Sequence, residues 1–194
     1  MNIWFIGNLL SLNLNKTHYL EFRTNNSSPI DINISYNNKY IVNTTITQFL
    51  GLVIDTLSWK NHVDKLMDRL SKAYYAIREV KQFIAQALRM TYFSYFHTIM
   101  SYGIIFWGNS FNSINIFRLQ KKVIRIITNS RNKDYCRELL KKLRTLPFYS
   151  QYIFSLLTFV INNCNFLISN SVIYHISTRH NNNLDLPHVS LSVY

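Results

Sequence analysis

The stretch VNTTITQFLGLVIDTLSWKNHVDKL, residues 42–66, changes from a β pattern to a helical pattern within a few residues. Its first part is rich in β-branched residues and predicts one buried strand over residues 47–54, with Gly51 in the middle. From Trp59 onward, apolar residues recur at steps of four and three. This spacing predicts a long amphipathic helix, and Ser58 is its expected N-cap.

Helical patterns dominate the chain from this point to residue 162. The predicted helices cover residues 59–84, 87–102, 113–128, 134–144 and 149–162, with an apolar connector at 104–110 and Asp134 as a candidate cap. Toward the N-terminus, the shorter patterns predict a helix at 4–12, a strand at 17–24 and a hairpin around Asn37 and Asn38.

The order of these patterns predicts an α+β fold that is mainly α, in three parts. Residues 1–57 are expected to form a small β-hairpin region that includes the strand before the first long helix. Residues 58–162 are expected to form a helical bundle. Residues 163–194 are rich in asparagine and are expected to form an extended tail.

The charge balance of the chain is strongly positive. Its 194 residues include 21 Lys and Arg but only 9 Asp and Glu, which gives a net charge of +12, and 48% of the residues are hydrophobic. A positive excess of this size, on a chain that can build a core, indicates a polyanionic partner such as nucleic acid or an acidic membrane surface. A basic protein without such a partner is the alternative.

Several other classes of protein are excluded or disfavoured. The two cysteines, Cys136 and Cys164, are far apart, and the six histidines have no zinc-ligand spacing. The N-terminus lacks the basic region of a signal peptide, and residues 154–161 are far fewer than the roughly 20 apolar residues that span a bilayer. We therefore expect an intracellular protein of the cytoplasm or nucleus, with no membrane span and no small-molecule ligand.

The clearest candidate site is the basic face of the helix predicted at residues 113–128. Its cations follow one another at spacings of three and four, while Phe117, Ile124 and Ile127 are expected on the opposite side. The cations of this helix and of the segments after it that we expect to contact phosphates are Arg118, Lys121, Lys122, Arg125, Arg131, Lys133, Lys141, Lys142 and Arg144. Because acids are nearly absent here, contact with successive phosphates is favoured over a merely solvated helix face.

The aromatic residues and the carboxylates are weaker indicators of function than the basic helix. Tyr92, Phe93, Tyr95, Phe96 and Trp107 could stack on bases, but aromatic residues at this density are more typical of a core. The nine acids provide no pair that could hold two Mg²⁺ ions, and no glycine-rich phosphate loop or nucleophile motif is present. The sequence therefore predicts no catalytic centre in this chain by itself.

Several stretches, in this order and spacing, carry motifs of one family. They are WFIGNLLSLNLNKTHYLEFRT (4–24), FLGLVIDTLSWKNHV (49–63), YFHTIMSYGIIFWGNS (95–110), LQKKVIRII (119–127) and IYHISTRHNNNLDLP (173–187). They resemble non-LTR retrotransposon (jockey-like) reverse transcriptases, from the segment after the catalytic Asp-Asp hairpin through the primer grip and the thumb to the tail. That hairpin would lie before Met1. The resemblance thus implies a truncated RNA-directed DNA polymerase that is inactive alone.

The resemblance also implies roles for particular residues. Lys16 matches the family's motif-D lysine, a general acid toward the leaving pyrophosphate. Phe49, Leu50 and Gly51 match the hairpin at the palm edge that positions the primer 3′ end. The basic helix would line the thumb against an RNA or DNA template–primer, and Mg²⁺ would belong to the intact enzyme, with no cofactor in this chain. The alternatives are a stand-alone basic helical nucleic-acid-binding protein, and a membrane-surface or protein-interaction helical module.

Overall fold

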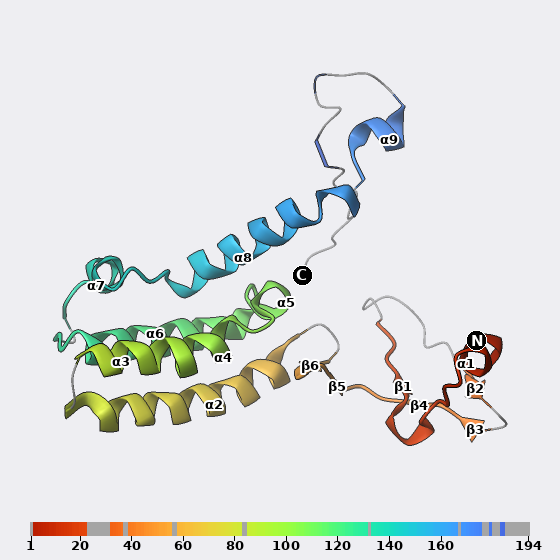
Figure 1. The fold of residues 1–194 in the computed structure, drawn as a ribbon, viewed down its shortest axis with the longest axis horizontal. Coiled ribbons are helices and arrows are strands. Elements are labelled where there is room, and N and C mark those ends of the chain that lie inside the picture. Colours follow the sequence, from red (N-terminus) through yellow and green to blue (C-terminus); the bar gives the residue numbers. More distant parts are fainter. Residues whose placement is uncertain are drawn as a thin grey trace. The chain divides into compact units, whose positions relative to one another are not determined.

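A computed structural model gives the fold of the chain (Figure 1). The residues that it describes are 2–22, 32–36, 39–55, 58–82, 85–131, 133–166, 168–175, 179, 183 and 184. The chain divides into two compact units, Met1–Tyr152 and Ile153–Tyr194. The described part is mostly helical with a few short strands, which confirms the predicted α+β, mainly α class.

The elements before residue 47 are all short. They are helix α1 (Asn2–Gly7), the 3₁₀ helix η1 (Leu14–Lys16) and strands β1 (His18–Tyr19), β2 (Ser35–Tyr36), β3 (Lys39–Tyr40) and β4 (Val42–Asn43). The antiparallel pairing of β2 with β3 confirms the predicted hairpin, whose turn residues lie outside the described part. Helix α1 is shorter than predicted. Strand β1 is also shorter than predicted, and it pairs with β4 in parallel.

A second hairpin corrects the prediction of one buried strand over residues 47–54. Strands β5 (Thr47–Phe49) and β6 (Leu52–Ile54) pair antiparallel, and Leu50 and Gly51 form the turn between them. Their φ angles are 46° and 80°, as a two-residue type I′ turn requires. Among the hairpin side chains, Val53 is buried, and Phe49 and Leu50 are exposed at the tip.

The long helix α2 (Lys60–Glu79) begins where the sequence predicts, but it is capped differently. Its N-cap is Trp59, not the predicted Ser58, and Trp59 has a φ of 56°. The buried carboxylate of Asp55 accepts hydrogen bonds from Trp59 N (3.0 Å) and Ser58 Oγ (2.9 Å). The Ser58 hydroxyl in turn accepts from Lys60 N at 3.3 Å. An upstream carboxylate therefore organises this helix start, which the local capping pattern did not indicate.

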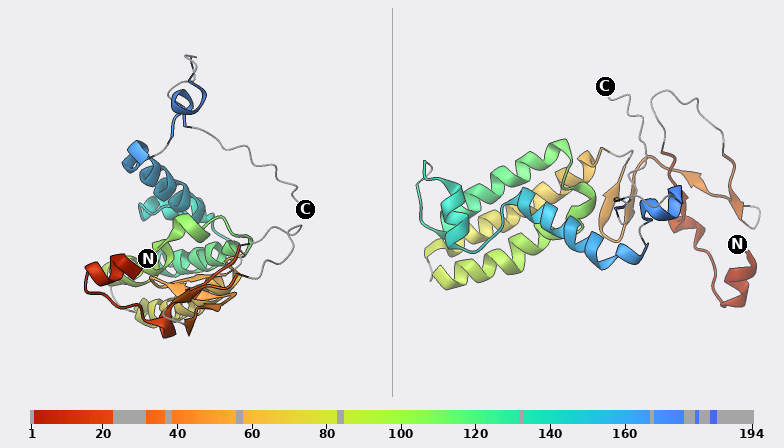
Figure 2. Two further views of the ribbon diagram at one scale, coloured as in Figure 1. Left: turned by 90° about the vertical axis from the view of Figure 1, so that its right-hand side faces the viewer. Right: turned by 90° about the horizontal axis from the view of Figure 1, so that it is seen from above.

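The core of the first unit lies between α2 and the helices that follow. These are η2 (Val80–Gln82, 3₁₀), α3 (Ala85–Thr91), the π-helix η3 (Tyr92–His97), α4 (Thr98–Ser101), α5 (Ile104–Trp107) and α6 (Ile114–Ile127). Both ribbon views show α2, the α3–α4 run and α6 lying alongside one another (Figures 1 and 2). The predicted apolar stripe of α2 is buried at Val63, Leu66, Leu70, Ala73 and Ile77.

The aromatic residues mostly belong to this core, as predicted. Tyr92, Phe96 and Trp107 are fully buried, whereas Tyr95 is 39% exposed. Trp107 lies in α5, so the segment predicted as an apolar connector contains a helical turn. Gly103 precedes it with a φ of 60° and faces the Leu52 side chain, which would have to shift to admit a Cβ.

The last helices of the chain are α7 (Cys136–Lys142), α8 (Phe148–Asn162) and α9 (Asn170–Tyr174), with the 3₁₀ helix η5 (Cys164–Phe166) after α8. Asp134 does not cap α7, because its carboxylate accepts from the Arg131 N–H at 2.8 Å and Tyr135 is the N-cap. Helix α9 and η5 occupy part of the segment predicted to be an extended tail.

Candidate nucleic-acid interface

Helix α6 separates apolar from basic residues along its length. Its buried residues are Ile116, Leu119, Gln120, Val123, Ile124 and Ile127, which face the bundle. Arg118 and Lys122 lie four residues apart on the other side and are exposed. These two cations therefore occupy the surface that their spacing predicts.

The other two predicted cations of α6, Lys121 and Arg125, are less exposed and contact other residues of the chain. Lys121 is half-buried, and its Nζ lies 4.1 Å from the centroid of the Phe117 ring in a cation–π contact. Arg125 is also half-buried; its Nη2 donates to the Asp134 carbonyl at 3.5 Å, and its Nε is enclosed without a partner. Phe117 was expected on the side of α6 opposite the cations. Its contact with Lys121 shows that it does not lie only on that apolar side.

The loop after α6 and helix α7 continue the positive surface. Arg131, Lys133, Lys141 and Lys142 are all exposed. Lys141 Nζ lies 3.1 Å from a carboxylate oxygen of Glu138, but an exposed pair of this kind contributes little, about 0–1 kcal/mol. Residues 118–144 contain ten cations and two acids, and so carry +8 of the net charge of +12.

A groove of about 380 Å³ lies beside α7 and gathers three of these cations. Arg137, Lys141 and Arg144 line it together with the apolar side chains of Leu140 and Leu146. Arg137 was not among the predicted contact residues. Its spacing to Lys141 and Arg144, four and then three residues, is the signal that could have found it.

Helix α2 provides a contrast within the same molecule. Its exposed side carries Lys60, Lys65 and Lys72 but also Asp64 and Asp68, so charges of both signs alternate there. A mixed face of this kind is typical of a solvated helix surface. The strong excess of cations on α6 and α7, where Glu138 is the one acid within the two helices, is therefore not a general property of the helices described here.

The remaining predicted site residues lie in the N-terminal part of the first unit. Lys16 is exposed at the end of η1. Phe49 and Leu50 are 62% and 71% exposed at the tip of the β5–β6 hairpin, and the Leu50 carbonyl accepts a hydrogen bond from the Tyr102 hydroxyl. The tip is thus fixed on the end of α4 and presents its side chains outward. The role of Lys16 stays a prediction.

A metal site does not fit the described carboxylates. Asp55, the only buried one among them, already accepts hydrogen bonds from Ser58, Trp59 and Asn61. Among the described residues, no three His, Cys, Asp or Glu side chains come together as metal ligands.

No protein-family model matches the sequence, and neither the curated proteins nor the solved structures contain a match. Among the helices in the described part of the chain, none combines the length and the apolar character needed to cross a membrane. The site is therefore defined by its own geometry, a predominantly basic surface on a small helical bundle.

Proposed function

We propose that this chain binds the sugar–phosphate backbone of nucleic acid through the cations of α6, α7 and the loop between them. In this proposal it acts as the thumb-like, C-terminal part of a non-LTR retrotransposon reverse transcriptase and holds an RNA or DNA template–primer inside the cell. It carries no polymerase chemistry by itself. The observation that supports the proposal most is the accumulation of ten cations against two acids within residues 118–144.

The chemistry of this surface favours phosphates over base edges. Lysine and arginine side chains that neutralise phosphates release condensed counterions, which stabilises the complex without reading sequence. Arg118, Lys122, Arg131, Lys133 and Lys142 are exposed and have no ion-pair partner among the described residues. The Arg118 guanidinium donates a long hydrogen bond of 3.4 Å to Asn115 Oδ1, which a phosphate oxygen could replace. Binding should therefore depend on salt and only weakly on sequence.

A salt titration of the full chain with a labelled primer–template tests the proposal. If about five phosphates are neutralised, the affinity should fall roughly 500-fold between about 50 and 200 mM salt, because the logarithmic slope is about −0.9 per contact. An affinity that stays constant across this range would contradict the proposal.

Matched charge variants locate the surface. The double variant Arg118→Gln/Lys122→Gln on α6 should flatten the salt slope by about two contacts. The control, Lys60→Gln/Lys72→Gln on α2, removes the same charge from the exposed residues of the mixed-sign helix. It should change the slope much less. Equal effects of the two double variants would mean that net charge, not this surface, drives binding.

An anionic membrane surface is the second candidate partner, and the exposed apolar side chains of α8 favour it. This helix contains no charged residue, and Phe154, Leu157 and Ile161 are 58%, 55% and 70% exposed. Exposed apolar side chains on a basic protein suit attachment to a lipid interface. Binding to anionic vesicles that primer–template does not reduce would favour this candidate over the first.

A further inference from the structure

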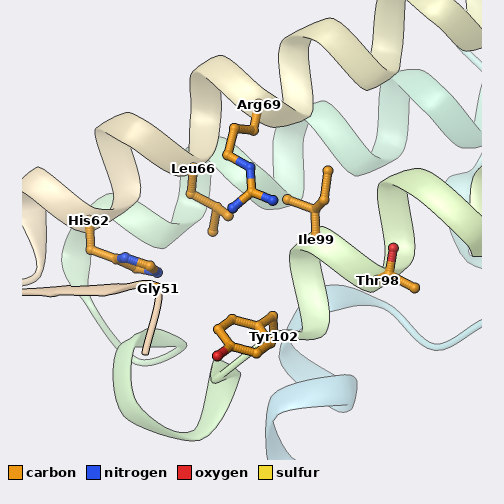
Figure 3. Close-up of a pocket in the computed structure, with 7 residues that line it drawn as sticks. All are labelled: Gly51, His62, Leu66, Arg69, Thr98, Ile99 and Tyr102. Atoms are coloured by element: carbon orange, nitrogen blue, oxygen red, sulfur yellow. The ribbon is translucent and has the colours of Figure 1, made fainter. Parts of the chain in front are cut away.

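A second pocket of the first unit, of about 340 Å³, lies away from the basic surface (Figure 3). The tip of the β5–β6 hairpin, one side of α2 and the end of α4 enclose it. Its lining residues are Gly51, His62, Leu66, Arg69, Thr98, Ile99 and Tyr102. The pocket is mainly apolar but contains a histidine and an arginine from the same helix.

His62 brings a donor without an acceptor to this pocket. The residue is 5% exposed, and its Nδ1 accepts a hydrogen bond from the Val53 N–H at 3.2 Å. A neutral imidazole that accepts at Nδ1 carries its proton on Nε2. The Nε2 atom is buried and has no partner in the described structure. A buried donor of this kind calls for an explanation, such as a ligand that accepts its hydrogen bond.

The aromatic neighbours of His62 hold this donor in place. The imidazole centroid lies 6.1 Å from that of the Trp59 ring and 5.7 Å from that of the Trp107 ring. The ring points from α2 toward Gly51, at the hairpin end of the pocket (Figure 3). Because both ring neighbours and the Val53 hydrogen bond fix it, the imidazole cannot easily turn to find another acceptor.

Arg69 supplies a positive charge to the same pocket. His62, Leu66 and Arg69 are spaced four and three residues apart, so one side of α2 presents all three (Figure 3). No ion pair or hydrogen bond links the Arg69 guanidinium to a described residue. Opposite it, Ile99 and the ring of Tyr102 form an apolar wall (Figure 3). An anion with an apolar body complements this combination.

We propose that this pocket binds a small organic oxyanion, a carboxylate or phosphate carried on an apolar body about the size of one aromatic ring. The planar guanidinium of Arg69 binds such a group through two parallel hydrogen bonds. One ligand oxygen accepts from His62 Nε2, after a local shift of the wall that encloses this atom. Leu66, Ile99 and Tyr102 contact the apolar body. This site departs from the expectation that the chain has no small-molecule ligand.

The site is independent of the proposed nucleic-acid surface, since the two share no residue. Titration of the full chain with benzoate and with phenyl phosphate tests it, followed by the ¹⁵N and ¹H resonances of His62. We expect saturable shifts and slower solvent exchange of the Nε2 proton with at least one of the two. The stronger ligand identifies the oxyanion. Acetate and inorganic phosphate lack the apolar body and should bind more weakly.

A variant pair decides the assignment. Arg69→Gln should weaken binding at least about tenfold, and Arg78→Gln, an exposed position of the same helix, should leave it unchanged. The absence of saturable shifts at His62 with both aromatic ligands would overturn the proposal. The proposal would also be overturned if the Arg69→Gln variant bound these ligands as tightly as the unmodified chain does.

Discussion

The side-chain amide of Gln120 joins three parts of the first unit. Its Nε2 donates to the Tyr92 hydroxyl at 3.1 Å and to the Leu146 carbonyl at 3.0 Å, and its Oε1 accepts from the Phe148 N–H at 2.8 Å. The residue is fully buried, yet both atoms of its amide have partners. Burial also raises the pKa of Tyr92 to about 12, so its hydroxyl remains protonated. The start of α8 is thus fastened to α6 and η3 by one polar side chain.

Replacing Gln120 by leucine should destabilise the protein by about 2–4 kcal/mol, because it leaves buried polar groups without partners. Urea unfolding measures the change. Gln48→Leu, at an exposed position of β5, serves as the control and should alter stability by less than about 0.5 kcal/mol. A loss for Gln120→Leu no greater than the control would show that the network contributes nothing.

His62 should make the stability of the protein depend on pH. Burial lowers the pKa of its imidazole, and the positive charge of Arg69 lowers this pKa further. Below about pH 6.5 the unfolded chain gains a proton that the folded chain does not, so stability falls as the pH drops toward the folded pKa. Above this range the contribution is constant. Burial lowers the pKa of His97 in the same direction.

Urea unfolding between about pH 7.5 and 5 tests this expectation. Each histidine contributes a slope of at most about 1.4 kcal/mol per pH unit. His62→Asn, whose Oδ1 is attached to Cγ like the Nδ1 that accepts from Val53 N, should retain only the part of the slope due to His97 and other groups. Stability that increases on acidification through this range would contradict the expectation.

At the scale of the elements, long helices were predictable and short elements were not. The stripe of α2 runs through about four turns from Val63 to Ile77, so its period is evident in the sequence, and the burial of these residues follows it. The four-residue helix α5 has no such signal. The residue pattern missed the turn at Leu50 and Gly51, because leucine rarely adopts a positive φ and the pattern predicted one strand; only the resemblance implied a hairpin here.

The same distinction holds for the candidate sites. The exposure of Arg118 and Lys122 follows from helical spacing within α6. The groove beside α7 also needs Arg144, which follows the helix at a φ of 52°, and its position depends on that turn. The donor of His62 depends on Val53 of another element, a contact that no spacing along the chain predicts.

A substitution at Leu50 should make the β5–β6 turn more stable. Asparagine tolerates positive φ better than leucine, and Asn-Gly is a preferred type I′ sequence. Because Leu50 is 71% exposed, little packing is lost on replacement. Leu50→Asn should therefore raise the free energy of unfolding by about 1 kcal/mol. Leu50→Val, a β-branched control, should lower it. The opposite order in urea unfolding would refute the turn assignment.

At the scale of the whole molecule, burial is distributed unevenly along the chain. Among residues 2–52, none of the side chains whose exposure is described is buried, and the first buried one is Val53. From there, buried residues recur through α2, α4 and α6 to Phe148. Segments with few buried contacts open more readily than those with many. The N-terminal third should therefore be the least stable part of the first unit.

Limited proteolysis tests this expectation. The residues before the β5–β6 hairpin should be cleaved early, which leaves a fragment that begins near residue 47 and includes the helices to about residue 150. Mass spectrometry of the products identifies the boundary. Early digestion of α2 or α6, with residues 2–52 left intact, would be the contrary result.

The π-helix at Tyr92–His97 has a consequence for insertions and deletions in this chain. A helical turn that holds one residue more than an α-helical turn shifts the phase of everything after it, by about 100° per residue. Removing one residue there, for example the exposed Ser94, would restore regular α-helix but would rotate Met100 away from the interior. The number of residues in this segment is therefore constrained. The chemical identity of its exposed residues is not constrained in this way.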